Sequence, residues 1–110
     1  MPTLVIASQA GPLPVSAIFN APSDGAAALF VAGSVWTQQQ NTMIGIQVML
    51  DGIAIGSAQI FANLAGVHIS VVPIIIPVQL TFGPHKLVLS ISTSATTSDS
   101  NDYYTVALMY

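Results

Sequence analysis

The sequence predicts an all-β domain built from antiparallel strands, and three observations lead to this class. Val, Ile and Thr are prominent along the chain, and these residue types are enriched in strands. Gly, Pro, Asn and Asp interrupt them at short intervals, which is typical of many short strands joined by turns. No segment carries the i, i+3, i+4 apolar pattern, with a charged opposite face, that indicates an amphipathic helix. The 110 residues fit one domain, 1–110, without an internal repeat or linker.

Nine strands are expected in chain order. Their ranges are 3–8, 13–20, 27–37, 42–50, 53–61, 67–72, 74–82, 86–93 and 103–110. The segments between them are polar or rich in Gly, Pro and Asn, as turns and loops are. The longest, 93–102, contains mostly Ser, Thr, Asn and Asp, and we expect it to be a surface loop.

The clearest predicted unit is a hairpin from Met43 to Phe61. Asp51-Gly52 lies between two apolar runs and favours a two-residue turn whose twist matches antiparallel strands. Closing this turn puts Val48 opposite Ile55, and every second residue then shares one face. The face expected in the core carries Ile44, Ile46, Val48, Leu50, Ile53 and Ile55.

The last strand, 103–110, is largely apolar on both faces. An antiparallel strand with one face in water should alternate apolar and polar residues, and this strand does not. The segment 71–78 has the same character, although Pro73 and Pro77 limit it to an edge, a bend or two short strands. Burial on both sides predicts a second cover, either a neighbouring subunit or a tightly packed monomeric sandwich. The residues expected at such a subunit interface are Tyr103, Tyr104, Val106, Leu108 and Tyr110.

Charge is too scarce for several classes of partner. Lys86 is the only base and four Asp are the only acids, so the net charge is -3. Nucleic-acid binding needs a basic group for each neutralised phosphate, and this chain offers one. No stretch approaches the roughly 18 uninterrupted apolar residues of a spanning helix, and the chain start lacks the basic and apolar regions of a signal peptide. An extracellular or particle-surface location is favoured.

Enzyme signatures are missing. The sequence contains no G-x-S-x-G, H-E-x-x-H, G-x-x-x-x-G-K-[ST] or G-x-G-x-x-G motif. His68 and His85 have no acidic residue beside them in the sequence, and we expect local or solvent hydrogen bonds for both. A metal ion held by one histidine from each of three symmetry-related copies is the alternative. We therefore predict no catalytic residue, no cofactor and no metal ligand.

The order of several segments resembles the jelly rolls of the tumour necrosis factor/C1q-like family. A Trp-containing strand (Gly33-Ser34-Val35-Trp36), the central hairpin, a long apolar pair and a Tyr-rich terminal strand follow one another. The ending Asn101-Asp102-Tyr103-Tyr104-Thr105-Val106-Ala107-Leu108-Met109-Tyr110 is similar to the last strand of bacterial C1q-like proteins. The resemblance implies a jelly-roll β-sandwich of about eight to ten strands, assembled as a compact homotrimer with the terminal strand near the three-fold axis. It gives no position for the calcium sites of some animal members.

Two groups of residues are candidates for ligand binding. Trp36 with Gln38 and Gln39 offers an aromatic ring for a sugar face and amides for its hydroxyls, although a lone Trp on a strand is often a core or interface residue. Asp99, Asn101 and Asp102 form the only acidic cluster, which suits either a weak calcium site or turn formation before the last strand.

These features lead to two function hypotheses. The first is a non-enzymatic structural module, a homotrimer that decorates a larger particle or ends a fibre. The alternative is a lectin-type jelly roll that binds carbohydrate at or near subunit interfaces, since jelly-roll lectins exist.

Overall fold

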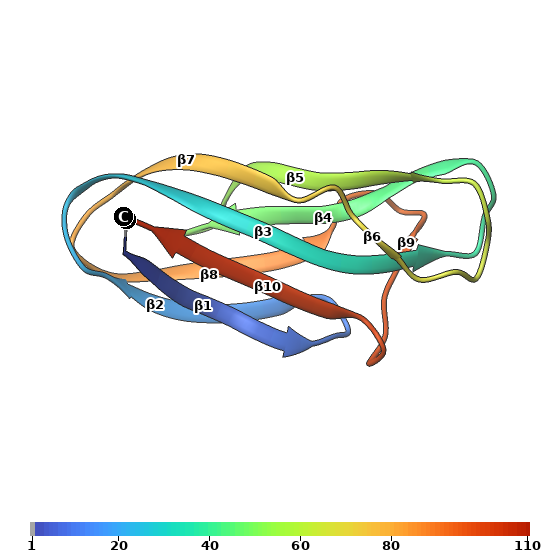
Figure 1. Ribbon diagram of the computed structural model, residues 1–110, viewed down its shortest axis with the longest axis horizontal. Coiled ribbons are helices and arrows are strands. Elements are labelled where there is room, and N and C mark those ends of the chain that lie inside the picture. Colours follow the sequence, from blue (N-terminus) through green and yellow to red (C-terminus); the bar gives the residue numbers. More distant parts are fainter. Residues whose placement is uncertain (1) are drawn as a thin grey trace.

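Two antiparallel sheets stack face to face in the computed structural model, which describes residues 2–110 (Figure 1). One sheet has six strands: β1 (Thr3–Ala10), β10 (Tyr103–Met109), β3 (Gly25–Thr37), β6 (Ile69–Ser70), β7 (Ile74–Leu80) and β9 (Thr96–Thr97). The other has four: β2 (Val15–Ala21), β8 (Gly83–Ile91), β4 (Thr42–Leu50) and β5 (Ile53–Ala62). The predicted all-β sandwich is confirmed. No helix among these residues is long and apolar enough to cross a membrane.

The long strand β3 organises the six-stranded sheet. Its first two thirds pair with both β10 and β7. Near its end, Ser34 and Val35 pair with β6, and Trp36 and Thr37 pair with β9. β1 pairs with β10, so the two chain ends meet, and the Tyr110 amide donates to the Pro2 carbonyl at 3.0 Å.

The core lies between the sheets, and β10 supplies much of it. Tyr104, Val106 and Leu108 are fully buried there. Three of the five residues predicted at a subunit interface therefore pack inside their own subunit, which corrects that prediction. Tyr103 and Tyr110 remain at the surface. The physical reason is the alternation of side chains along a strand, which sends one set inward and the other outward.

A β-bulge changes the predicted hairpin register. The turn forms as expected, with positive φ at both Asp51 and Gly52. The pairing then shifts, so that Val48 lies opposite Gly56 and not Ile55. The extra residue, Ile55, moves the side chains that follow it in β5 to the opposite faces, so that Ala58 and Ala62 are buried. Ile53 keeps its predicted partner Leu50, but it adjoins the turn and is 68% exposed, so its predicted place in the core is wrong.

The segment 93–102 is not the simple surface loop that its polarity predicts. Thr96 and Thr97 form β9 against the end of β3, and Thr96 and Asp102 are buried. Their side chains satisfy backbone groups that the sheets leave open. The amide of Gly45, for example, donates to Thr96 Oγ1 at 3.1 Å.

Candidate functional site

Three separate segments meet on the outer side of β3 near one end of the sandwich. Trp36 lies on β3 itself, and His68 directly precedes β6, which pairs with β3. This pairing places His68 across from Trp36, with ring centroids 5.6 Å apart and a tilt of 36°. The β9–β10 loop brings Asp99 and Asp102 to the same imidazole. We call His68, Asp99 and Asp102 the His–Asp cluster.

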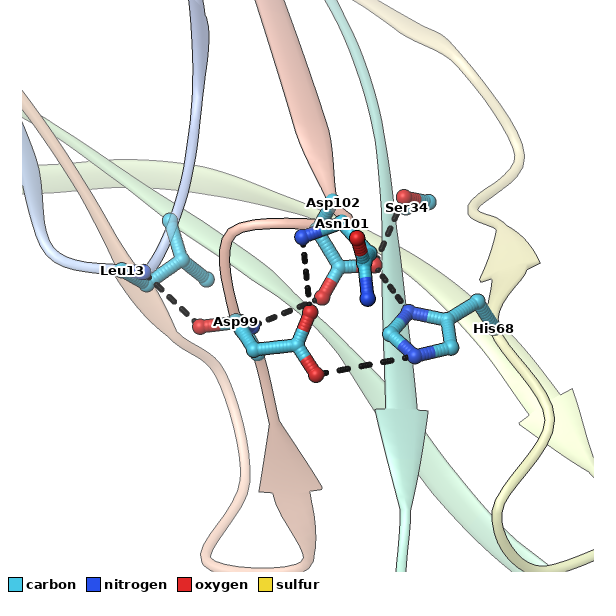
Figure 2. A network of polar contacts seen from close by, with 7 residues as sticks. Leu13, Ser34, His68, Asp99, Asn101 and Asp102 are labelled. Carbon is cyan, nitrogen blue, oxygen red and sulfur yellow. Dashed lines mark hydrogen bonds and ion pairs between the residues drawn. The ribbon is translucent and has the colours of Figure 1, made fainter.

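Asp102 is the fixed centre of this cluster (Figure 2). Its Oδ1 lies 2.7 Å from His68 Nδ1 and accepts a hydrogen bond from Ser34 Oγ at 2.8 Å. Its Oδ2 accepts from the Asp99 amide at 2.9 Å, and its side chain is 0% exposed. The Asp99 carboxylate is 41% exposed, and its Oδ2 lies 3.6 Å from His68 Nε2.

The electrostatics of the cluster favour a positive charge between the carboxylates. The hydrogen bond to Asp102 raises the pKa of His68, and the negative charges of Asp102 and Asp99 raise it further. Desolvation acts in the opposite direction and does not cancel this rise in pKa. Both ring nitrogens face carboxylate oxygens, which only accept hydrogen bonds, so the imidazolium form suits this position. Below the loop, burial raises the pKa of the Tyr104 hydroxyl to about 12, and this phenol stays neutral.

The arrangement is not that of a serine nucleophile. Activation of a serine requires its hydroxyl to face a general base. Ser34 donates its hydroxyl to Asp102, not to His68. The donor set of one imidazole and two carboxylates suits a cation instead, and one ligand atom from each residue lies within 4.8 Å of the others.

An apolar groove is lined by the segment 60–70, which also carries His68. It has a volume of about 420 Å³ and runs between the end of β5 and residues 63–70. Its lining residues are Ile60, Phe61, Asn63, Leu64, Val67, Ile69 and Ser70. We call it the edge groove. Phe61 presents an aromatic ring that is half exposed, and Asn63 and Ser70 supply an amide and a hydroxyl.

The structure brings together some of the predicted ligand residues. Trp36, Asp99 and Asp102 all gather at His68, and the backbone N–H of Asn101 donates to Asp99 Oδ1 at 2.8 Å. Gln38 and Gln39 lie apart in the exposed turn after β3, where the backbone N–H of Gln39 donates to Thr37 Oγ1 at 3.1 Å.

The sequence did not single out His68 or Phe61 as candidate ligand-binding residues. The acids that His68 contacts lie more than 30 positions away in the chain, at separations of 34 for Asp102 and 31 for Asp99. The available signal for Phe61 was its place at the end of a predicted strand, next to a turn rich in Asn and Gly.

The second histidine, His85, forms a separate pair on the other sheet. Its Nδ1 lies 2.6 Å from Asp51 Oδ2, and its Nε2 lies 2.7 Å from the Thr81 carbonyl. The Lys86 amide donates to Asp51 Oδ1 at 2.9 Å, and the ring of Phe19 stacks on the imidazole. The hydrogen bond to Asp51 raises the pKa of His85, and the same bond lowers the pKa of Asp51. Both histidines thus have hydrogen-bond partners. The bond from His85 to Thr81 is local, as predicted, whereas the acids that pair with the two histidines are remote in sequence.

Comparison with protein-family models finds no match, and neither does comparison with curated protein sequences. Solved structures do match. A β-glucosidase from Paenibacillus barengoltzii matches with a TM-score of 0.61 and 11% identity, over 98% of this chain and 10% of that one. A family 35 carbohydrate binding module from Clostridium thermocellum matches with a TM-score of 0.56 and 11% identity, over 96% and 90%. Murine APRIL matches with a TM-score of 0.52 and 12% identity, over 84% and 72%.

These similarities establish the fold. The chain is a jelly-roll β-sandwich, as the resemblance predicts, and its neighbours include a member of the tumour necrosis factor family. The chain spans about a tenth of the β-glucosidase that it matches. The finer resemblance to bacterial C1q-like proteins stays a prediction.

Proposed function

We propose that this chain is a non-catalytic carbohydrate-binding module and that the edge groove holds the sugar. The observation that carries the proposal is a groove with an exposed aromatic ring on its wall and polar groups beside it, on a fold shared with a carbohydrate binding module. Its volume of about 420 Å³ lies within the usual range of small-molecule sites, roughly 300–1,000 Å³.

The chemistry of the groove suits a neutral sugar. The apolar face of a pyranose ring packs on an aromatic side chain such as Phe61. The Asn63 amide can both donate to and accept from sugar hydroxyls. Ser70 donates its own proton to the Val71 carbonyl at 3.2 Å, which leaves its oxygen free to accept. No charged residue lines the groove, so an acidic or basic ligand would find no counter-charge there.

A substitution at Phe61 tests this assignment against a matched control. Phe61 is 51% exposed in the groove, whereas Phe82 is 72% exposed in the β7–β8 connection at the other end of the sandwich. We expect a panel of neutral oligosaccharides to include one that binds the wild-type chain and raises its melting temperature by mass action. Phe61→Ala should weaken that binding at least about tenfold, which corresponds to about 1.4 kcal/mol.

The control defines the contrary result. Phe82→Ala should bind the same oligosaccharide as tightly as the wild-type chain does. Equal affinity of Phe61→Ala and wild type, or no binding of any oligosaccharide at millimolar concentration, contradicts the proposal.

A homo-oligomeric assembly, predicted as a trimer, is the second candidate function, and the outer face of the six-stranded sheet favours it. None of the six strands contains a charged residue. The register places Val5, Ala107, Phe30 and Ile75 in one row across four strands on that face. Val5 and Ile75 are exposed, and a subunit contact would bury such an apolar row. Light scattering should then give about 34 kDa, three times 11.4 kDa, and Ile75→Lys should reduce it. A monomer at all concentrations rejects this candidate.

A further inference from the structure

We propose that His68, Asp99 and Asp102 bind one divalent transition-metal ion of the zinc type. The bound ion would fasten the segment that precedes β6 to the β9–β10 loop. This site lies beside the edge groove and is distinct from it, and its occupancy requires no sugar.

The positions of the ligand atoms support a single ion. One nitrogen and two carboxylate oxygens lie within 4.8 Å of one another. Zinc bonds of about 2.0–2.2 Å place tetrahedral ligands roughly 3.5 Å apart. His68 Nε2 and Asp99 Oδ2 are already 3.6 Å apart, and the most widely separated pair of ligand atoms must close by up to about 1 Å. Asp99 is 41% and His68 34% exposed, and both lie outside the regular strands, which leaves them free to make that movement.

The donor set distinguishes the metal. Calcium and magnesium prefer sites made only of oxygen atoms, whereas imidazole suits zinc, copper and nickel. A site with three protein ligands leaves a fourth tetrahedral position for water, as in other zinc centres with an open position. The imidazole therefore favours a zinc-type ion over the calcium ion considered for Asp99 and Asp102.

The surrounding charges also call for a cation. The Asp102 carboxylate is 0% exposed, and burial of a charge is unfavourable without a partner of opposite sign. The chain has a single Lys and no Arg, and that residue, Lys86, belongs to β8 of the other sheet. Two carboxylates against one imidazole leave net negative charge even when His68 is protonated. A divalent ion removes this excess.

The groups around Asp102 already orient it for such a role. Ser34 Oγ holds one carboxylate oxygen and the Asp99 amide holds the other. Outer hydrogen bonds of this kind fix the direction of a metal ligand and are worth about 10–100-fold in metal affinity. The carboxylate is thus held in place before any ion arrives.

Calorimetric titration of the tag-free chain with zinc chloride at pH 7.5 tests the proposal. We expect one ion per chain and competition by a chelator. Asp99→Asn and His68→Gln should each weaken zinc affinity at least about tenfold. Asp99 is the safer position, because its exposed side chain contributes less to folding. Calcium chloride should bind more weakly than zinc.

His85→Gln is the matched control, because it removes a second histidine that also pairs with an aspartate. It should keep the wild-type zinc affinity. The affinity should also fall at pH 5.5, since the metal must displace a proton from His68. Absence of zinc binding by the wild type below millimolar concentration, or an equal loss in His85→Gln and His68→Gln, overturns the proposal. Because no sugar is present, the outcome is independent of the groove.

Discussion

The two histidine–aspartate pairs of this molecule have similar short contacts and opposite surroundings. His68 meets Asp102 at 2.7 Å near the β5–β6 connection, and His85 meets Asp51 at 2.6 Å near the β4–β5 turn. These places lie toward opposite ends of the sandwich (Figure 1). In one pair the aspartate is buried and the histidine is 34% exposed, whereas in the other the aspartate is 47% and the histidine 10% exposed.

The His85 pair is closed by the protein itself. Both imidazole nitrogens have acceptors, from Asp51 and the Thr81 carbonyl, and both carboxylate oxygens have donors, from His85 and the Lys86 amide. Its contacts join the β4–β5 turn to the start of β8. We call this pair the His85 clamp, because its nitrogen and oxygen atoms all have partners within the protein.

The His68 pair is open because a second carboxylate shares the imidazole. The contact between Asp99 Oδ2 and His68 Nε2 is long, at 3.6 Å, and Asp99 is solvent-accessible. The comparison teaches that a short His–Asp contact does not by itself distinguish a clamp from a candidate site. What distinguishes them is the second ring nitrogen, which has a short contact to the Thr81 carbonyl in His85 and only the long contact to the exposed Asp99 in His68.

The largest expected effect separates the two aspartates. In Asp102→Asn, one carboxylate oxygen is replaced by an NH2 group, which faces the backbone N–H of Asp99 or the Ser34 hydroxyl that now donates to Asp102. Because the site is buried, these donors lose their acceptor, and we expect a loss of about 2–3 kcal/mol of unfolding free energy. Asp51→Asn should cost less than about 1 kcal/mol, because the site is exposed and Asn tolerates the positive φ of 51°. Urea unfolding measures both. Equal losses would show that burial is not what separates the pairs.

A smaller effect concerns the pH dependence of the His85 clamp. The folded-state pKa of His85 is raised above 6.5, mainly by Asp51. The clamp therefore contributes fully below pH 6.5, and its contribution is lost as the pH rises through the raised value. The wild type should melt above His85→Gln at pH 6, and the difference should shrink toward pH 9. Its size should stay below about 1 kcal/mol, as for exposed pairs.

The measurement belongs in chelator-containing buffer, so that no metal at the His–Asp cluster contributes. Loss of the clamp at acidic pH depends on Asp51. The pKa of Asp51 is lowered from 3.8, so its part of the clamp is lost only as the pH falls through that lowered value. A difference between wild type and His85→Gln that grows from pH 6 to pH 9 contradicts the assignment.

Much of the fold could be predicted from local patterns. The alternation of strand and turn residues located most of the strands, and Asp51-Gly52 located the tightest turn, because these signals act over a few residues. The bulge after Val48 has no such local signal, so the predicted pairing of Val48 with Ile55 was wrong. The faces of the last strand could not be assigned either, because both are apolar. In the structure the ring of Tyr104 packs closely over Gly33 of β3, where a larger side chain would clash with it.

The site was harder to predict because its contacts are made by topology. Trp36, Asp99 and Asp102 were chosen for their chemistry, and the structure brings them together. His68 joins them only because β6 pairs with β3, a contact between segments about 35 residues apart in a short bridge of two residue pairs. A bridge that short leaves no periodicity to detect. The edge groove depends likewise on how residues 63–70 pack against β5.

The smallest expected effect concerns Lys86, the only basic side chain of the chain. Lys86 enters the clamp through its backbone amide, which donates to Asp51, and its side chain is exposed. Lys86→Gln keeps that amide and should change the unfolding free energy by less than about 0.5 kcal/mol, as surface substitutions usually do. His85→Gln measured beside it in the same urea titration at pH 6 should lose more. If Lys86→Gln loses as much as His85→Gln, the side-chain charge also stabilises Asp51, and the clamp would then depend on the charge of the lysine as well as on the histidine. The His–Asp cluster has no basic side chain other than an imidazole. The two pairs would then differ in the net charge around the aspartate, and not only in whether the imidazole nitrogens already have protein partners.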